Sequence, residues 1–245
     1  MSNVNPKKFF LALIQAVSLP LAALSLPAQA APIRVTITVD NSYALFYGSQ
    51  TAATNFVGSD FNWFVPETYN FDLPSDRYLY VVTASDLAVA QGFLGQFQNL
   101  ETGYKFYSND PQWQVMATGL RNTEPAPYTG SSTDLALLTR EILDANGGGN
   151  PSGGWVGLTP GPTNGSAPWG TIAGIDAAAR WSWYSSNGDP DPTEPGFNHS
   201  EWLVFRVPVA ATPNAVPEPG SLALAAVALA GLGATQRKRQ GKSQA

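Results

Sequence analysis

The sequence contains no cysteine and only one histidine, His199, among its 245 residues. The lack of cysteine excludes disulfide bonds, thiolate nucleophiles, iron–sulfur clusters and cysteine-ligated zinc. Sites that need two histidines are also excluded, and any Ser/His/Asp arrangement would have to use His199. Because most familiar catalytic residue types are missing, we expect a protein that is not an enzyme and has no catalytic residues.

Positive charge is scarce in the central part of the chain. Between Ala31 and Ala215 there are 7 basic and 17 acidic residues, which gives a net charge of −10. Phosphate backbones and anionic bilayers repel such a surface, so nucleic-acid binding through a basic patch is close to excluded. The whole chain is nevertheless 44% hydrophobic and 11% aromatic. This is too apolar for a disordered acidic segment, and we expect residues 31–213 to fold as one domain.

The first 30 residues have the three-part order of a secretory signal peptide. Lys7 and Lys8 precede an apolar run over residues 9–26, and two small residues, Ala28 and Ala30, frame a cleavage site. This order predicts export and removal of residues 1–30 by signal peptidase after Ala30. The alternative is an N-terminal membrane anchor, which the prolines within and after the apolar run disfavour.

Residues 214–240 also have three parts. The tripeptide Pro217, Glu218 and Pro219 precedes an apolar run that begins at Ser221. A basic cluster of Arg237, Lys238 and Arg239 follows that run. A helix of about 15 residues spans about 22 Å, which is short of the roughly 30 Å hydrocarbon core of a bilayer. The basic cluster would stay on the cytoplasmic side, with the body of the protein outside. The segment is therefore predicted to be a short transmembrane helix that acts as a temporary tether.

This tail resembles the PEP-CTERM sorting signal that exosortase systems recognise in Gram-negative bacteria that make extracellular polysaccharide. The resemblance implies transient anchoring in the inner membrane and cleavage near Pro219 by an exosortase-type membrane protease. It further implies delivery to the cell surface or to the extracellular matrix. The alternative is an ordinary C-terminal anchor in which Pro-Glu-Pro occurs by chance.

The central part of the chain reads as short strands separated by turns. Apolar and polar residues alternate from Ile33 to Val39, as in a half-buried strand. Eight further runs, rich in aromatic and β-branched residues, are predicted strands: 43–47, 69–73, 78–84, 93–97, 104–107, 113–117, 180–184 and 201–209. Such a pattern predicts a mainly β protein, an antiparallel β-sandwich, rather than parallel βαβ units.

One short helix interrupts the predicted strands. It is expected to begin at the capping residues 131–134 and to end at Asn146 and Gly147, packed over the sandwich or its rim. The glycine- and proline-rich stretch over residues 146–170 would by itself suggest a linker. Because Trp155 and Trp169 lie within it, we expect an ordered loop folded against the domain instead.

The order of the segments also resembles the galactose-binding-like jelly-roll sandwich of many carbohydrate-binding modules and bacterial surface proteins. The likeness rests on four features of the sequence. They are an early strand and turn at residues 39–46, a middle hairpin at residues 69–84 together with Trp63, a small-residue strand at residues 92–95, and closing strands at residues 180–183 and 205–206. The insertion from Leu120 to Gly170 departs from a compact version of that fold. The resemblance implies a jelly-roll-like sandwich.

Two kinds of ligand are predicted. Asp189, Asp191 and Glu194 lie within six residues and offer the hard oxygen ligands that calcium takes, although a solvated acidic turn is the alternative. Asp40 and Asn41 are a weaker second calcium candidate. The seven tryptophans suggest stacking on sugar rings, but most are expected in the core and at most one or two at a ligand. Those near loops or strand ends are Trp113, Trp155, Trp169 and Trp202.

The expected function is that of an exported, non-enzymatic protein of the cell surface or extracellular matrix, with an adhesive, structural or carbohydrate-binding role and an extracellular polysaccharide as partner. The alternative is a secreted polysaccharide-active hydrolase that uses two carboxylates about 5 to 10 Å apart. A third possibility is a sandwich that binds protein or other copies of itself.

Overall fold

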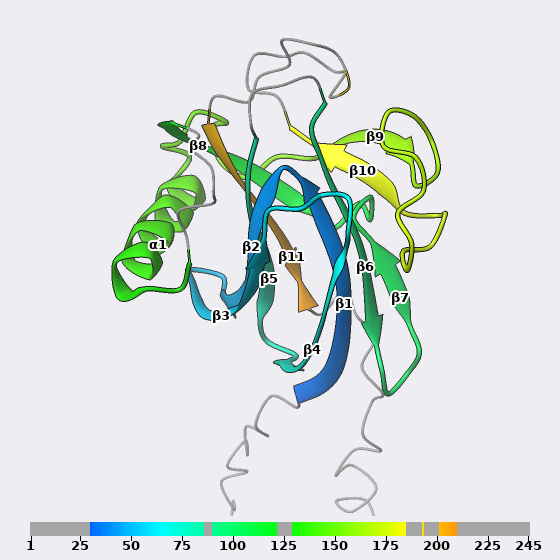
Figure 1. Cartoon of the computed structure of the whole chain (residues 1–245). Helices are drawn as coiled ribbons and strands as arrows, with labels where there is room; N and C mark the ends of the chain where they lie inside the picture. The colour runs from blue at the N-terminus through cyan, green and yellow to red at the C-terminus, as the bar shows by residue number, and fades with distance from the viewer. Residues whose placement is uncertain (1–29, 86–89, 122–128, 185–192, 194–200, 210–245) are drawn as a thin grey trace, which may run out of the picture.

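The computed structural model describes residues 30–85, 90–121, 129–184, 193 and 201–209. These residues form eleven strands and one helix (Figure 1). In chain order the elements are β1 (Ala30–Asp40), β2 (Ser42–Ser49), β3 (Ala52–Asp60), β4 (Glu67–Pro74), β5 (Tyr78–Ala84), β6 (Gly92–Asn99), β7 (Lys105–Tyr107), β8 (Gln114–Arg121), α1 (Ser132–Gly147), β9 (Thr159–Thr163), β10 (Arg180–Trp183) and β11 (Glu201–Pro208).

The strands form two antiparallel sheets. Sheet A has the order β4-β1-β6-β10-β9, with β7 paired to β6, and sheet B has the order β3-β2-β5-β11-β8. The chain passes from one sheet to the other between β1 and β2, so that consecutive strands contribute to both layers. The predicted fold class, a mainly β protein with antiparallel sheets and one helix, is confirmed.

The main core lies between the two sheets. Ile33, Val35, Ile37 and Val39 share one face of β1, as their alternation predicts, and are at most 3% exposed. Sheet B contributes Leu45, Val81 and Phe205 to the same cluster, among others. Apolar side chains from both inner faces are thus removed from water together, which is the dominant stabilising contribution in a sandwich.

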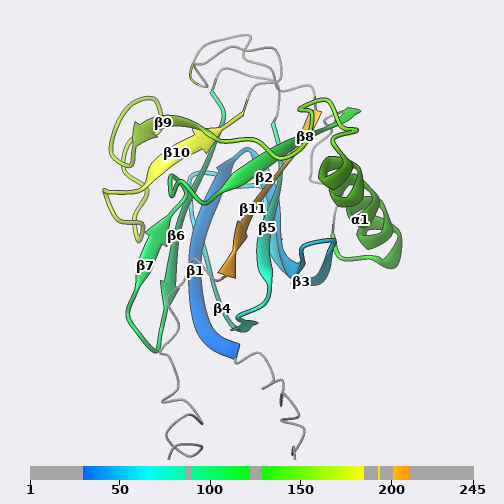
Figure 2. The ribbon, with the colours of Figure 1, turned by 180° about the vertical axis from the view of Figure 1, so that it is seen from behind.

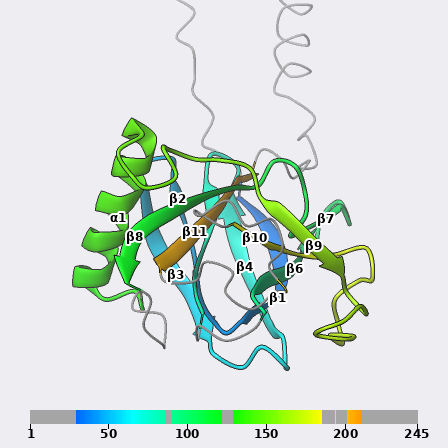
Figure 3. The ribbon, with the colours of Figure 1, turned by 90° about the horizontal axis from the view of Figure 1, so that it is seen from above.

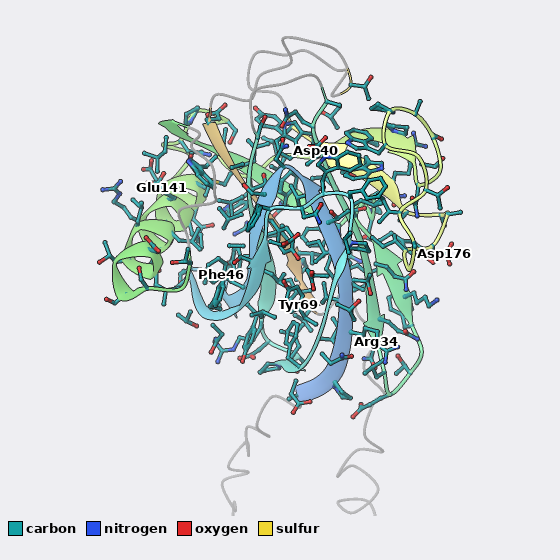
Figure 4. The ribbon with its side chains drawn as sticks, viewed as in Figure 1. Arg34, Asp40, Phe46, Tyr69, Glu141 and Asp176 are labelled. Carbon is teal, nitrogen blue, oxygen red and sulfur yellow. The ribbon has the colours of Figure 1, made fainter. Side chains whose placement is uncertain are left out.

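Each sheet is also covered on its outer face, so the molecule has more than two layers. Helix α1 covers sheet B (Figure 3; Figure 4), and its Leu138 and Ile142 belong to one buried apolar cluster with Phe46. On the opposite side of the molecule, beside β9 and β10 (Figure 2), the loop between these two strands covers sheet A. There Trp169 stacks on Trp181 with ring centroids 4.2 Å apart. The expectation that the loop after the helix folds against the domain is therefore correct.

Two strands, β3 and β9, were not expected from the sequence. Strand β3 lies at the edge of sheet B and is mostly half-exposed or exposed, so its residues lack the buried alternation that marks a strand. Strand β9 has the sequence Thr-Pro-Gly-Pro-Thr and lies at the edge of sheet A. Proline is tolerated at such an edge because its missing N–H can face away from the ladder.

Helix α1 is 16 residues long and begins as the capping signal predicts. The Ser131 hydroxyl oxygen accepts a hydrogen bond from the backbone N–H of Asp134 at 3.2 Å. The left-handed stop lies at Gly148, with φ of 75°, one residue later than expected. No helix among the described residues combines the length and hydrophobicity needed to span a membrane.

Replacing Ser131 by alanine is expected to lower the free energy of unfolding by about 1 kcal/mol, because the N–H of Asp134 then loses its capping acceptor. Urea denaturation followed by circular dichroism would measure the change. Ser132→Ala is the matched control, since Ser132 is exposed and follows the cap. Equal losses from the two substitutions would show that the Ser131 hydroxyl does not cap the helix.

Candidate binding site

The outer face of sheet B carries one buried cation, Arg206. Its position on β11 follows from the strand alternation, which places Trp202, Val204 and Arg206 on the face opposite to the inter-sheet core. In the sheet register, Arg206 lies opposite Tyr80 on β5 and Gln114 on β8. Its side chain is 6% exposed. The strand pairing therefore presents a guanidinium group, flanked by a phenol and an amide, to whatever covers this face.

The end of helix α1 and the loop that follows it cover the guanidinium. The Asn146 Oδ1 atom accepts hydrogen bonds from Arg206 Nη1 at 3.0 Å and from the Trp155 indole Nε1 at 2.9 Å. The Nδ2 of the same amide donates to the backbone oxygen of Gln50 at 3.1 Å. Asn146 therefore connects the helix, the following loop, strand β11 and the turn between β2 and β3.

Two aromatic rings lie close to the guanidinium. The central carbon of Arg206 lies 3.7 Å from the centroid of the Trp155 ring and 5.3 Å from that of Tyr78. The ring quadrupoles of tryptophan and tyrosine attract a cation at these distances. The side chain is fixed further by a hydrogen bond from Nε to Gln114 Oε1 at 3.0 Å. The cation is thus held in one place by rings and amides.

A cavity of about 680 Å³ opens beside this cluster. Its lining combines Arg206, Trp155 and Asn146 with Gln50, Thr51 and the glycines that follow α1. The volume lies within the range of about 300–1,000 Å³ that is usual for small-molecule sites. Trp155 is partly exposed here, whereas the guanidinium beneath it is buried. We call this group the Trp155 pocket.

The charge of the Trp155 pocket comes from Arg206. Burial lowers the pKa of Arg206, while the neighbouring Tyr80 and Tyr78 act in the opposite direction. Arginine stays protonated under such shifts, so the site carries one positive charge. Burial also raises the pKa of Tyr80, which keeps that phenol neutral. Among the described residues, both ion pairs lie elsewhere, at Arg77 and Arg140, and Arg206 is not part of them.

A second, smaller cavity lies beside the segment between β7 and β8. It has a volume of about 330 Å³ and is lined by Asp110, Trp113, Leu158 and Ser182, among others. Trp113 is only 1% exposed, and its Nε1 atom donates to the backbone oxygen of Tyr107 at 3.0 Å. The indole is therefore committed to the core, and this cavity offers a ligand less ring surface than the Trp155 pocket does.

The crossover between β3 and β4 exposes large apolar side chains. Phe61 is 73% exposed and Phe64 is 68% exposed, while Trp63 between them is partly buried against the cover of sheet A. Asp60 pairs with Tyr43 and Glu67 pairs with Ile37, so the crossover lies near the Asp40 end of β1. Strand β1 starts, and β11 ends, at the opposite end of the sandwich (Figure 1).

Of the tryptophans predicted to stack on sugars, three are buried in the core and one is partly exposed. Trp113, Trp169 and Trp202 are at most 5% exposed and belong to the apolar clusters, so they are core residues. Trp155 alone of the four predicted candidates is partly exposed and lines a cavity. Trp155 and Trp63, which lies on the other sheet, are the two partly exposed tryptophans, and the expectation that at most one or two tryptophans contact a ligand stays a prediction.

Several predicted site residues lie outside the described residues, and the structure says nothing of them. They are the calcium candidates Asp189, Asp191 and Glu194, the signal-peptide residue Ala28, the single His199 and the whole sorting motif. Ala30, the last residue before the predicted signal cleavage, is the first residue of β1. In the part of the chain that the structure describes, no three His, Cys, Asp or Glu side chains group as a metal site. Asp40 of the weaker calcium candidate instead accepts a hydrogen bond from Trp169 Nε1 at 2.7 Å.

Arg206 and Asn146 were not predicted as site residues. One signal was present for Arg206: in the strand pattern it follows Trp202 and Val204 on the same face, so a cation continues an otherwise apolar series. A cation at such a position indicates either a solvated strand end or a buried guanidinium with a specific environment. No comparable signal marks Asn146, which reads as part of the helix stop.

Comparison with known proteins identifies the C-terminal tail. Residues 215–238 match the family model of the PEP-CTERM protein-sorting motif. No curated protein and no solved structure matches the chain. The likeness to galactose-binding-like sandwiches therefore stays a prediction. The matched motif indicates transient membrane anchoring and processing by an exosortase, a membrane protease. The chain is thus an exported protein that carries a PEP-CTERM sorting motif at residues 215–238.

Proposed function

We propose that the protein is a non-enzymatic binder of extracellular polysaccharide, released from its membrane tether to the cell surface or matrix. The observation that carries this proposal is the Trp155 pocket, in which an indole ring, amide groups and a guanidinium line one cavity. Sugar rings present C–H faces that pack on aromatic rings and hydroxyls that bond to amides, so this combination suits a saccharide. Export through a sorting tail is consistent with an extracellular ligand.

The composition of the pocket favours binding over hydrolysis. Glycosidases use two carboxylates on either side of the scissile bond, whereas this lining combines Arg206, Trp155 and Asn146 with neutral polar and glycine residues. The side chains are also fixed by several bonds at once, since Asn146 accepts from both Trp155 and Arg206. A pre-ordered site of this kind loses little conformational entropy when it takes a ligand.

Retention on a panel of immobilised polysaccharides would test the proposal. We expect the exported protein to be retained on at least one polymer, with no new reducing ends after prolonged incubation. Trp155→Ala is expected to weaken retention by about tenfold, which corresponds to the loss of roughly 1.4 kcal/mol of ring contact. Circular dichroism would show whether the variant keeps its fold.

Trp63→Ala is the matched control, because Trp63 is the other partly exposed tryptophan and lies over sheet A rather than sheet B. It should leave retention unchanged. New reducing ends would favour the hydrolase alternative. Retention that depends on Trp63 and not on Trp155 would move the binding surface to the crossover between β3 and β4. Self-association in light scattering without retention on any polymer would favour the third possibility.

A further inference from the structure

Arg206 is an unusual residue for the interior of this protein. It is the one buried arginine among the side chains that the structure describes, and it lies on a sheet face that is otherwise packed with apolar groups. Taking a charge out of water is costly unless a partner of opposite charge or several hydrogen bonds compensate for it. By contrast, Arg77 and Arg140 have carboxylate partners within 3.3 Å.

The groups around Arg206 compensate for its burial without neutralising its charge. Its hydrogen bonds go to two amide oxygens, Gln114 Oε1 and Asn146 Oδ1, and to the phenol oxygen of Tyr80. Its ring neighbours are Tyr78 and Trp155. All of these are neutral groups. The site therefore keeps a net positive charge in a sheltered place, which a ligand of opposite charge would complete.

The N–H donors of the guanidinium that remain free also favour a negatively charged ligand. A guanidinium has five N–H donors in a planar fork. The bonds to Gln114 and Asn146 use one at Nε and one at Nη1, and a bond to Tyr80 uses a further donor, so donors remain for a ligand. Carboxylates match this fork because they accept two parallel N–H bonds. One cation matches the single negative charge of one carboxylate.

We propose that the Trp155 pocket binds an acidic sugar, a uronate or another carboxylated residue, with its carboxylate on Arg206 and its ring against Trp155. This inference rests on the proposed function, which it narrows from polysaccharides in general to those that carry carboxylates. Arg206 and Trp155 line the same cavity, which suits one sugar unit that offers both an apolar face and an acid group.

Calorimetry on the unaltered exported protein would test the inference. The probes are short oligomers of galacturonate, glucuronate and mannuronate, each compared with its methyl ester, which keeps the ring and removes the charge. We expect at least one acid to bind about tenfold or more tightly than its ester, as a charge-assisted bidentate contact requires. Free acetate serves as a further arm, because comparable affinity for acetate would assign the site to any carboxylate and overturn a sugar ligand.

Arg206→Gln is expected to abolish the preference for the acid while leaving the weak binding of the ester. Arg34→Gln is the matched control, because it removes the same charge from an exposed arginine on β1, away from α1 (Figure 4). Equal affinity for acid and ester in the unaltered protein would overturn the inference whether or not Arg206→Gln folds. A preference that persists in a folded Arg206→Gln variant would also overturn it.

These outcomes are distinct from a failure of the proposed function. If only neutral polysaccharides bind, and their binding depends on Trp155, the proposed function stands and the acidic ligand is wrong. If neither acidic nor neutral saccharides bind, both proposals are wrong.

Discussion

Replacing Phe93 by alanine is expected to lower the free energy of unfolding by about 3–5 kcal/mol, the range seen when a buried phenylalanine is truncated. Phe93 lies on β6, which pairs with β1 and β10 in sheet A. Its ring centroid is 5.1 Å from that of Trp113 and 5.2 Å from that of Phe205 across the interface between the sheets. Removing the ring would leave a cavity between the two sheets and would remove its contacts with Trp113 and Phe205.

The expected loss is large because domains of this kind are only about 5–15 kcal/mol more stable than their unfolded chains. Urea denaturation of the exported protein, followed by tryptophan fluorescence and circular dichroism, would measure it. Phe61→Ala is the matched control: Phe61 is 73% exposed, and its truncation should change stability by no more than about 0.5 kcal/mol. A loss below 1 kcal/mol for Phe93→Ala would show that the two sheets do not pack as described.

Most of the strands could be predicted because their burial has the period that a strand imposes. In β1, the four apolar residues from Ile33 to Val39 alternate with polar ones and do form the inner face of sheet A. The same pattern predicted water on the other face, yet Thr36 and Thr38 are buried as well. Their hydroxyls bond to residues distant in the sequence: Thr38 Oγ1 donates to the backbone oxygen of Trp63 at 2.7 Å, and Thr36 Oγ1 lies 3.2 Å from Thr68 Oγ1. What covers an outer face is decided by distant segments, and alternation within one strand carries no information about them.

The candidate site was harder to predict than the fold. Trp155 could be named as a candidate because an indole in a glycine-rich loop needs something to pack on. Asn146 and Arg206 are 60 residues apart, and only the docking of α1 onto sheet B brings Asn146 Oδ1 to 3.0 Å from Arg206 Nη1. No periodic pattern fixes the position of a helix end over a particular strand residue. Tertiary packing therefore determines the site, whereas the local alternation of apolar and polar residues predicts the strands.

The sorting motif and the Trp155 pocket lie in different parts of the chain, and this separates transport from binding. Residues 215–238 match the sorting motif, while every residue that lines the pocket lies between Gln50 and Arg206. Loss of the tail therefore removes none of the groups that hold Arg206 and Trp155. Ligand binding and tail processing can for this reason be altered independently, and a variant in one should leave the other intact.

Replacing Pro217, Glu218 and Pro219 together by alanine is expected to abolish processing of the tail. These residues are the first part of the matched motif and precede its apolar segment and its basic cluster. Intact-mass analysis of the surface and medium fractions should find the unaltered protein without its last residues, beyond about Pro219, when the exosortase is present. The triple variant should keep a C-terminus at Ala245, as should the unaltered protein in a strain that lacks the exosortase.

Pro213→Ala is the matched control, because Pro213 precedes the matched residues 215–238 and its loss should leave processing unchanged. The Trp155→Ala variant should also be processed normally, since Trp155 lies far from the motif in the sequence. A triple variant that is still shortened would show that the protease does not require Pro-Glu-Pro in this chain. An unaltered protein that keeps Ala245 in both strains would contradict exosortase processing, and the polysaccharide proposal would then apply to a membrane-tethered domain rather than to a released one.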